Sequence, residues 1–361
     1  MNDLISVLMC VYNTPVLYLR EAVMSIIGQS YNNLEFVIVD DSSDDGDVID
    51  YLEELACDDN RVKLIHNKEN SGLTRALNIG LKQCHGKYIA RMDSDDISLA
   101  NRLIIQYDYM EKNRDVALVG SNIISFGEGL EEKDETGTDD AFDDPEGYRI
   151  RSLMQHSGPA HPTFMFRREF LEKNGIEYRE DILKAQDYGI MCDILLAGGI
   201  IRKIRAPLLK YRIHSGQITN TAEIEQKAYQ CRVSYDNFKK VFPDLDGEEC
   251  AALSLLGCDY EYDDLLRAVK RNKKLSETCG FLISNKDRCG DYNNYIKAIK
   301  KVIILNKRNG KYNSGSFNIE LRSKWWKKAL RTSIQLKSPW GMKPFTLFSY
   351  MFAWRLEHNK K

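Results

Sequence analysis

The stretch that decides the fold is Tyr88-Ile89-Ala90-Arg91-Met92-Asp93-Ser94-Asp95-Asp96. A mostly apolar run is followed at once by three carboxylates in four positions. An apolar run of this length predicts a buried strand. The carboxylates therefore stand where a strand ends, which is where ligands bind in a sheet of parallel strands.

The chain around this stretch alternates expected strands with expected helices. Strands are predicted over residues 4–12, 35–39, 61–66, 87–92 and 116–120, with helices in the intervals between them. This alternation predicts βαβ units and a mainly parallel sheet, so the expected fold class is α/β. A second acidic cluster, residues 40–45, follows the strand at 35–39 and should lie at the same edge.

Composition excludes several classes of protein. The 361 residues are 43% hydrophobic and 29% charged, with a net charge of -2, so neither a disordered chain nor a strongly basic nucleic-acid binder is expected. The nine cysteines form no C-x-x-C and indicate a reducing compartment. No run of 18 apolar residues exists, and we expect a cytoplasmic protein. The Gly-rich signatures of dinucleotide oxidoreductases and P-loop NTPases are absent from the sequence.

The carboxylates at the strand ends suggest a metal site. Phosphates do not bind bare carboxylates, whereas Mg²⁺ and Mn²⁺ bind carboxylates and phosphates together. Asp93 and Asp95 are separated by one residue and can point at one locus. The spacing is a weak pattern, and the alternative is that Ser94 or Asp95 caps a following helix.

Four blocks of sequence in register carry a family resemblance. They are residues 6–13, 37–43, 70–78 and 88–96, and together they closely resemble the family 2 glycosyltransferases. The resemblance extends over about the first 215 residues. It implies a GT-A fold and transfer of a sugar from a nucleotide diphosphate with inversion. The helical, charged pattern from about residue 219 adds a C-terminal helical extension. Cys10 is a departure, because the family usually has proline there.

The resemblance also implies roles for individual residues. The backbone of residues 11–13 would cradle the base and ribose, and Asp41 would accept the N3–H of uracil or a similar base. Arg75 would approach the nucleotide, Asp93 would face the ribose and metal, and Asp95 would bind the metal directly. The implied nucleotide-binding residues are Val11, Tyr12, Asn13, Asp41, Asn70, Arg75, Asp93 and Ser94.

Two further blocks complete the implied site. Lys184-Ala185-Gln186-Asp187-Tyr188 resembles the family's E-D block, which makes Asp187 the expected catalytic base, with an N-cap role as the alternative. Gln186 replaces the family's acid. The Y-R-x-H pattern ending at His214 implies a third metal ligand beside Asp93 and Asp95, for Mg²⁺ or Mn²⁺; a structural histidine is the alternative.

The remaining sequence divides the chain. We expect a nucleotide-sugar-binding half at 1–125, an acceptor half at 126–218 that includes an exposed acidic loop at 127–147, and a helical region at 219–361. Residues 301–361 hold 14 Lys/Arg against two Asp/Glu, and all four tryptophans. Such a basic, Trp-rich segment favours an anionic membrane surface, contacted through residues 321–361; packing on the catalytic domain is the alternative.

The sequence thus predicts a metal-dependent inverting glycosyltransferase. Its partners would be a nucleotide-sugar donor, most simply a UDP-sugar, and a saccharide or lipid-linked saccharide acceptor of a bacterial surface polysaccharide, at the inner face of the membrane. No nucleic acid is expected. Two alternatives remain: a sugar nucleotidyltransferase, which should carry a Gly-rich loop after the first strand, and a non-catalytic nucleotide-sugar-binding assembly partner, which need not keep Asp95 or Asp187.

Overall fold

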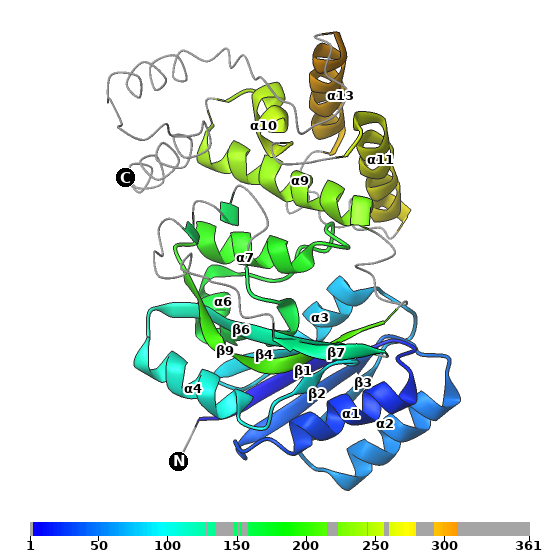
Figure 1. The fold of residues 1–361 in the computed structure, drawn as a ribbon, viewed down its shortest axis with the longest axis vertical. Helices are drawn as coiled ribbons and strands as arrows, with labels where there is room; N and C mark the ends of the chain where they lie inside the picture. The colour runs from blue at the N-terminus through cyan, green and yellow to red at the C-terminus, as the bar shows by residue number, and fades with distance from the viewer. Residues whose placement is uncertain are drawn as a thin grey trace. The chain divides into compact units, whose positions relative to one another are not determined.

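A computed structural model describes residues 3–127, 129–134, 148–149, 152–153, 158–214, 223–243, 245–255, 260–278 and 292–308. The chain divides into two compact units (Figure 1). The first comprises residues 1–145 and 158–220, and the second comprises residues 146–157 and 221–361. The three-part division expected from the sequence, with boundaries at 125 and 218, stays a prediction.

The first unit begins with four parallel strands. They are β1 (Ile5–Val11), β2 (Leu34–Asp40), β3 (Val62–His66) and β4 (Tyr88–Asp93), in the order β3-β2-β1-β4. Helices α1 (Val16–Ile27), α2 (Gly46–Asp58) and α3 (Leu73–Leu81) connect them. The predicted α/β alternation is therefore confirmed.

The register aligns the carboxyl ends of these strands. Val11 on β1 pairs with Asp40 on β2, which pairs in turn with His66 on β3. Cys10, the preceding residue on β1, pairs with Asp93 on β4. The two acidic clusters of the sequence consequently lie at one edge of the sheet, as expected for parallel strands.

The sheet continues past β4 as β8-β6-β9-β5. The new strands are β5 (Ile97–Ser98), β6 (Val116–Gly127), β8 (Met165–Arg167) and β9 (Ile200–Ile213). Strand β8 runs antiparallel to both of its neighbours, whereas β6 and β9 are parallel to each other. Strand β9 also pairs with the short β5, which directly follows the acidic stretch after β4.

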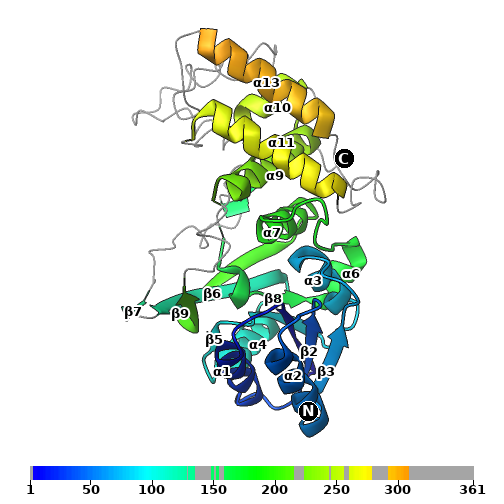
Figure 2. The same cartoon turned by 90° about the vertical axis from the view of Figure 1, so that its right-hand side faces the viewer.

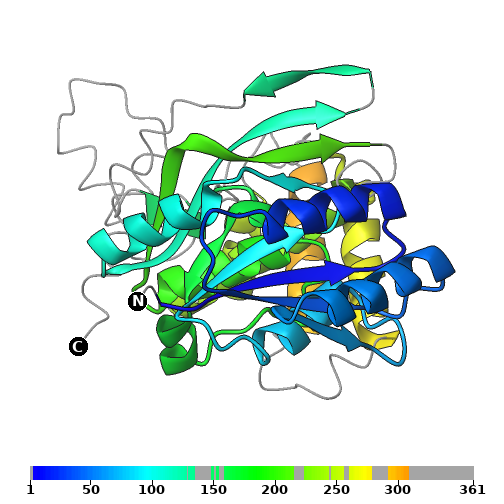
Figure 3. The same ribbon diagram turned by 90° about the horizontal axis from the view of Figure 1, so that it is seen from below.

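Helices cover both faces of this sheet (Figures 2 and 3). On one face lie α1, α2 and α4 (Arg102–Lys112), and on the other lie α3, α6 (Arg168–Asn174) and α7 (Gln186–Leu196). Alternate residues of the strands point to opposite faces, so Val7 and Met9 of β1 join the core with α1 and α2. Leu8 points instead toward α3.

One expectation about the acidic segment is wrong. Residues 127–147 were expected to form an exposed loop, but Leu130–Asp134 forms a strand, β7, antiparallel to β6. All five residues of β7 are exposed, and Glu132 forms an ion pair with Lys210 of β9. Backbone pairing with β6 therefore produces the strand in a segment that buries no side chain. Residues 135–147 lie outside the described residues.

The described part of the second unit is helical. It contains α9 (Glu223–Val241), α10 (Gly247–Ser254), α11 (Tyr262–Thr278) and α13 (Tyr292–Arg308). Arg232 is buried in this unit, with its guanidinium over the rings of Tyr292 and Tyr295. Among the described residues, no helix has the length and apolar character of a membrane span. The expected membrane-contact segment, residues 321–361, lies outside the described residues.

Candidate active site

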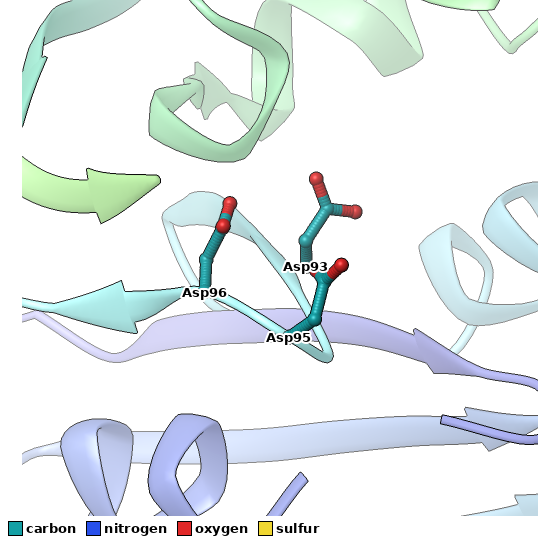
Figure 4. A group of neighbouring side chains, drawn as sticks. All are labelled: Asp93, Asp95 and Asp96. Atoms are coloured by element: carbon teal, nitrogen blue, oxygen red, sulfur yellow. The ribbon is translucent and has the colours of Figure 1, made fainter. Parts of the chain in front are cut away.

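Three carboxylates converge just past the end of β4. Asp93, Asp95 and Asp96 project to the same side of the loop between β4 and β5 (Figure 4). Each offers an oxygen within 4.8 Å of the others. The next helix, α4, begins at Arg102 with Asn101 as its N-cap, so neither Ser94 nor Asp95 caps it. The capping alternative for this motif is therefore excluded.

Each carboxylate of this triad has a different partner. Asp93 forms a two-pronged ion pair with the buried Arg91, and Asp95 Oδ2 lies 2.9 Å from His214 Nε2. Asp96 is fully buried and accepts a hydrogen bond of 2.8 Å from the backbone N–H of Arg212. Its other oxygen, Oδ2, has no hydrogen-bond partner among the described residues.

The electrostatics of the triad favour a bound cation. Burial raises the pKa of Asp93, and the charge of Asp95 raises it further against the opposing effect of Arg91. Burial also raises the pKa of Asp96 well above its usual value, with Asp93 and Asp95 acting in the same direction. Crowded carboxylates with one buried oxygen unpaired are a donor set that suits a hard divalent cation.

Arg212 connects the end of β9 to the loop that carries the triad. Its Nε donates to the carbonyl oxygen of Asp95 at 2.7 Å, and its Nη2 forms an ion pair with Glu21 of α1. The guanidinium stacks over the rings of Tyr18 and Phe126, with centroid distances of 4.2 and 4.5 Å. His214, two residues further along, is thereby brought to Asp95. The predicted site included His214 but not Arg212.

The second acidic cluster holds a loop rather than lying free. Asp41 Oδ1 accepts hydrogen bonds from Asn67 Nδ2 at 2.6 Å, and from the backbone N–H and Oγ of Ser71 at 3.0 and 2.7 Å. Asp41 Oδ2 accepts from the backbone N–H of Gly72 at 2.7 Å, which also bonds Asn70 Oδ1 at 3.1 Å. Asn67 belongs to this arrangement but was not predicted.

The segment after β1 contacts the second acidic cluster. Val11 O accepts the backbone N–H of Asp41 at 2.8 Å. Asn13, with a φ of 48°, donates its own N–H to Ser43 Oγ at 3.1 Å. Tyr12 between them is 51% exposed, so its ring is accessible to a ligand.

Two more of the expected nucleotide-binding residues are placed by specific contacts. Ser94 Oγ lies 2.7 Å from Thr14 Oγ1, which joins the triad loop to the end of β1. Arg75, on α3, lies with its Nε 3.6 Å from Glu180 Oε2. The structure thus brings the expected nucleotide-binding residues to one edge of the sheet, while their binding roles stay predictions.

Asp187 lies in the first turn of α7. The N-cap of that helix is Ala185, so Asp187 is not the cap and this alternative is excluded. Its charge raises the pKa of both Asp93 and Tyr178. Gln186, where the family carries an acid, has a buried Oε1 without a hydrogen-bond partner among the described residues.

Comparisons with known proteins identify the class. The model of glycosyl transferase family 2 matches residues 6–175. An uncharacterized glycosyltransferase of Haemophilus influenzae is 32% identical over 65% of this chain and 73% of its own length. The O-antigen biosynthesis glycosyltransferase WbnJ of Escherichia coli is 34% identical over 64% of this chain and 88% of its own. The chain belongs to glycosyl transferase family 2 and is a transferase.

Solved structures share the fold. Residues 1–349 of S. aureus TarS in complex with UDP-GlcNAc match with a TM-score of 0.56 and 18% identity, covering 90% of this chain and 98% of that one. The mannosyltransferase PcManGT from Pyrobaculum calidifontis, in complex with GDP-Man and Mn²⁺, matches with a TM-score of 0.50 and 14% identity, covering 100% and 89%. At these identities the likeness establishes the GT-A fold of this chain.

Proposed function

We propose that this chain transfers a sugar from a UDP-sugar, with inversion, to a saccharide or lipid-linked saccharide in bacterial surface-polysaccharide synthesis. One observation carries the proposal: a carboxylate triad at the strand ends, with Asp96 Oδ2 buried and without a hydrogen-bond partner among the described residues, can hold the divalent cation that a donor diphosphate needs. The triad can serve the diphosphate, and Asp187 in the first turn of α7 can serve the acceptor hydroxyl. The likeness to WbnJ supports the surface-polysaccharide assignment.

The nucleotide would bind between the ends of β1 and β2. Each oxygen of a carboxylate has about two lone-pair sites that can accept a hydrogen bond. Asp41 Oδ1 already accepts three, whereas Oδ2 accepts the N–H of Gly72 and has capacity for the N3–H of a uracil base. Tyr12 follows Val11, whose carbonyl oxygen accepts the Asp41 N–H, so its exposed ring could stack on that base.

The triad fits a divalent cation, Mg²⁺ or Mn²⁺. Asp93, Asp95, Asp96 and the imidazole of His214 would hold it, since hard cations favour oxygen ligands and Mn²⁺ also accepts nitrogen. Such an ion would neutralise charge on the donor diphosphate and on the departing nucleoside diphosphate. Arg212 keeps the triad loop and His214 together, which fixes the site before the donor arrives.

Asp187 would act on the acceptor. Inversion requires the acceptor hydroxyl to attack the anomeric carbon from the face opposite the diphosphate. As that bond forms, Asp187 would accept the hydroxyl proton, which is general base catalysis. Because Gln186 replaces the neighbouring acid, no second carboxylate from this block would contact the acceptor.

A panel of nucleotide sugars tests the proposal. The purified chain is incubated with Mn²⁺ or Mg²⁺ and with UDP-, GDP-, dTDP- and CMP-sugars, and release of the nucleotide is measured with water as acceptor. We expect turnover of a UDP-sugar that stops on chelation and in Asp95→Asn. Turnover of a GDP-sugar alone would overturn the donor assignment. Tight UDP binding without any turnover would indicate a non-catalytic binding partner.

A further inference from the structure

Helix α3 holds the segment that leads to Asp187, and it does so through a buried asparagine. Asn78 Nδ2 donates to the carbonyl oxygen of Tyr178 at 2.9 Å, and the backbone N–H of Tyr178 donates to Asn78 Oδ1 at 2.9 Å. Asparagine is unfavourable inside a helix. Here its side chain is buried and satisfies both backbone groups of one distant residue, as a neighbouring strand would.

A second contact extends this attachment by one turn of the helix. Thr74, four residues before Asn78 and therefore on the same face of α3, donates its Oγ1 to the carbonyl oxygen of Ile182 at 3.1 Å. Thr74 is also buried. The chain between Tyr178 and Ile182 is thus fixed at both ends, five residues before Asp187 at the nearer end.

The helix itself is fixed to the sheet and to the predicted nucleotide loop. A Cβ added to Gly80 would lie 3.1 Å from Val39 Cγ2 and closer still to Leu8 Cδ1, so α3 packs tightly on β1 and β2. Its N-cap is Gly72, whose N–H is bonded to Asp41. One short helix therefore connects the Asp41 loop with the segment that precedes Asp187.

Tyr178 is held at its side chain as well as at its backbone. It is buried, and its hydroxyl oxygen lies 2.8 Å from His161 Nε2. Burial raises the pKa of Tyr178, Arg91 opposes this effect, and the charges of Asp187 and Asp93 act in the same direction as burial. With its backbone held by Asn78 and its hydroxyl held by His161, Tyr178 is fixed at both ends.

We propose that Asn78 is a positioning residue, which acts through Tyr178 to hold Asp187 in place relative to the donor site. Asn78 contacts neither substrate; it fixes the backbone of the segment from Tyr178 to Ile182, which enters α7. The inference rests on the proposed function in one respect, the role of Asp187 as base. The attachment of the segment to α3 does not depend on that role.

The test combines kinetics with hydrogen exchange in three variants. Asn78→Ala removes both bonds to Tyr178, Asn78→Asp keeps the acceptor for the Tyr178 N–H, and Asn174→Ala is the matched control, since it removes a bond within the exposed end of α6. We expect kcat for UDP-sugar hydrolysis to fall roughly 10–100-fold in Asn78→Ala, because small misplacements of a reacting group have large effects. Asn78→Asp should retain an intermediate rate, and UDP affinity should be unchanged in both.

Two further measurements separate positioning from a loss of stability. Amide exchange in residues 177–187 should become faster in Asn78→Ala while β1 and β2 stay protected. In the Asp187→Asn background, Asn78→Ala should lower the residual rate little, because the two act on one step. Thr74→Val, an isosteric loss of a single bond, should show the same pattern more weakly and serves if Asn78→Ala folds poorly.

Several outcomes would overturn the inference. They are an unchanged rate, a parallel loss of UDP affinity, an additive effect in the Asp187→Asn background, or unchanged exchange in residues 177–187. Failure of the proposed function is distinguishable, because an active Asp187→Asn enzyme would reject the base while faster exchange in Asn78→Ala would still support the attachment.

Discussion

At the scale of single residues, substitution of Asp95 tests the metal site most directly. Asp95→Asn keeps the shape of the side chain but removes its charge from a crowded carboxylate cluster. Metal-dependent UDP binding should be lost, while thermal stability should not fall, because like charges in the cluster repel one another. Calorimetric titration with UDP and Mn²⁺, together with a thermal melt, measures both. Asp108→Asn, an exposed acid on α4, is the control. Wild-type turnover that persists after exhaustive chelation would contradict the prediction.

Asp187 gives the complementary test on the acceptor side. Asp187→Asn should lower the rate of transfer by roughly 10²–10⁴, which is the usual contribution of a general base. UDP affinity should stay nearly unchanged, since the base acts on the acceptor alone. Steady-state kinetics and UDP titration on the same preparation decide it. If affinity and rate fell together, Asp187 would belong to the donor site.

At this scale the sequence predicts the positions of the acids. It does not predict the residues that hold those acids in place through hydrogen bonds. Asp93 and Asp95 follow a strand whose apolar pattern is local and readable. Arg212 bonds Asp95 across 117 positions, through the pairing of β9 with β5, and no local pattern encodes that contact. Asn67 and Asn78 were missed for the same reason, because their hydrogen-bond partners lie far along the chain.

At the scale of elements, Gly86 sets how closely the chain entering β4 approaches β1. A Cβ there would lie 2.8 Å from the carbonyl oxygen of Leu4 and closer still to the backbone nitrogen of Ser6, so backbone rather than a side chain would have to shift. Gly86→Ala should reduce the free energy of unfolding by about 1–3 kcal/mol. Urea denaturation measures the change. Gly46→Ala is the control, since its Cβ would meet nothing within 4 Å in the first turn of α2, and it should be neutral or stabilising. Equal stability of the two variants would contradict the prediction.

Some strands can be predicted from an apolar pattern in their own sequence, whereas others form because a neighbouring strand pairs with their backbone. Strands β1, β2 and β4 are buried along most of their length, so continuous apolar runs predict them. Strand β7 is exposed at every residue and exists because β6 pairs with it, so its sequence resembles that of a charged loop. Strand β9 mixes exposed and buried positions over 14 residues, with an irregular register against β6, so neither a continuous apolar run nor a strict alternation predicts it.

At the scale of the whole molecule, the second unit includes chain from two places. Residues 146–157 belong with residues 221–361, and Asn237 on α9 donates to the carbonyl oxygen of Leu153 at 3.0 Å. The sequence grouped 146–157 with the acceptor half because the two are adjacent in the chain. Composition can mark where a region starts, but it cannot show that a short segment returns to pack on helices 84 positions away.

The basic segment at the end of the chain is tested as a whole. Residues 301–361 carry 14 Lys/Arg and two Asp/Glu, a balance of +12, and all four tryptophans. Packing on the catalytic unit would explain the aromatic rings but not so much charge of one sign. An anionic lipid surface explains both, at about 1 kcal/mol per Lys or Arg near the surface, with indole rings at the interface. Deleting residues 321–361 should therefore release the enzyme from phosphatidylserine-containing vesicles in co-sedimentation, while UDP-sugar hydrolysis in solution persists.

High salt should weaken binding of the full chain, because exposed charges are screened, and neutral phosphatidylcholine vesicles are the control. A full chain that ignores anionic vesicles, or a truncated chain that fails to fold, would show that the segment packs on the protein instead.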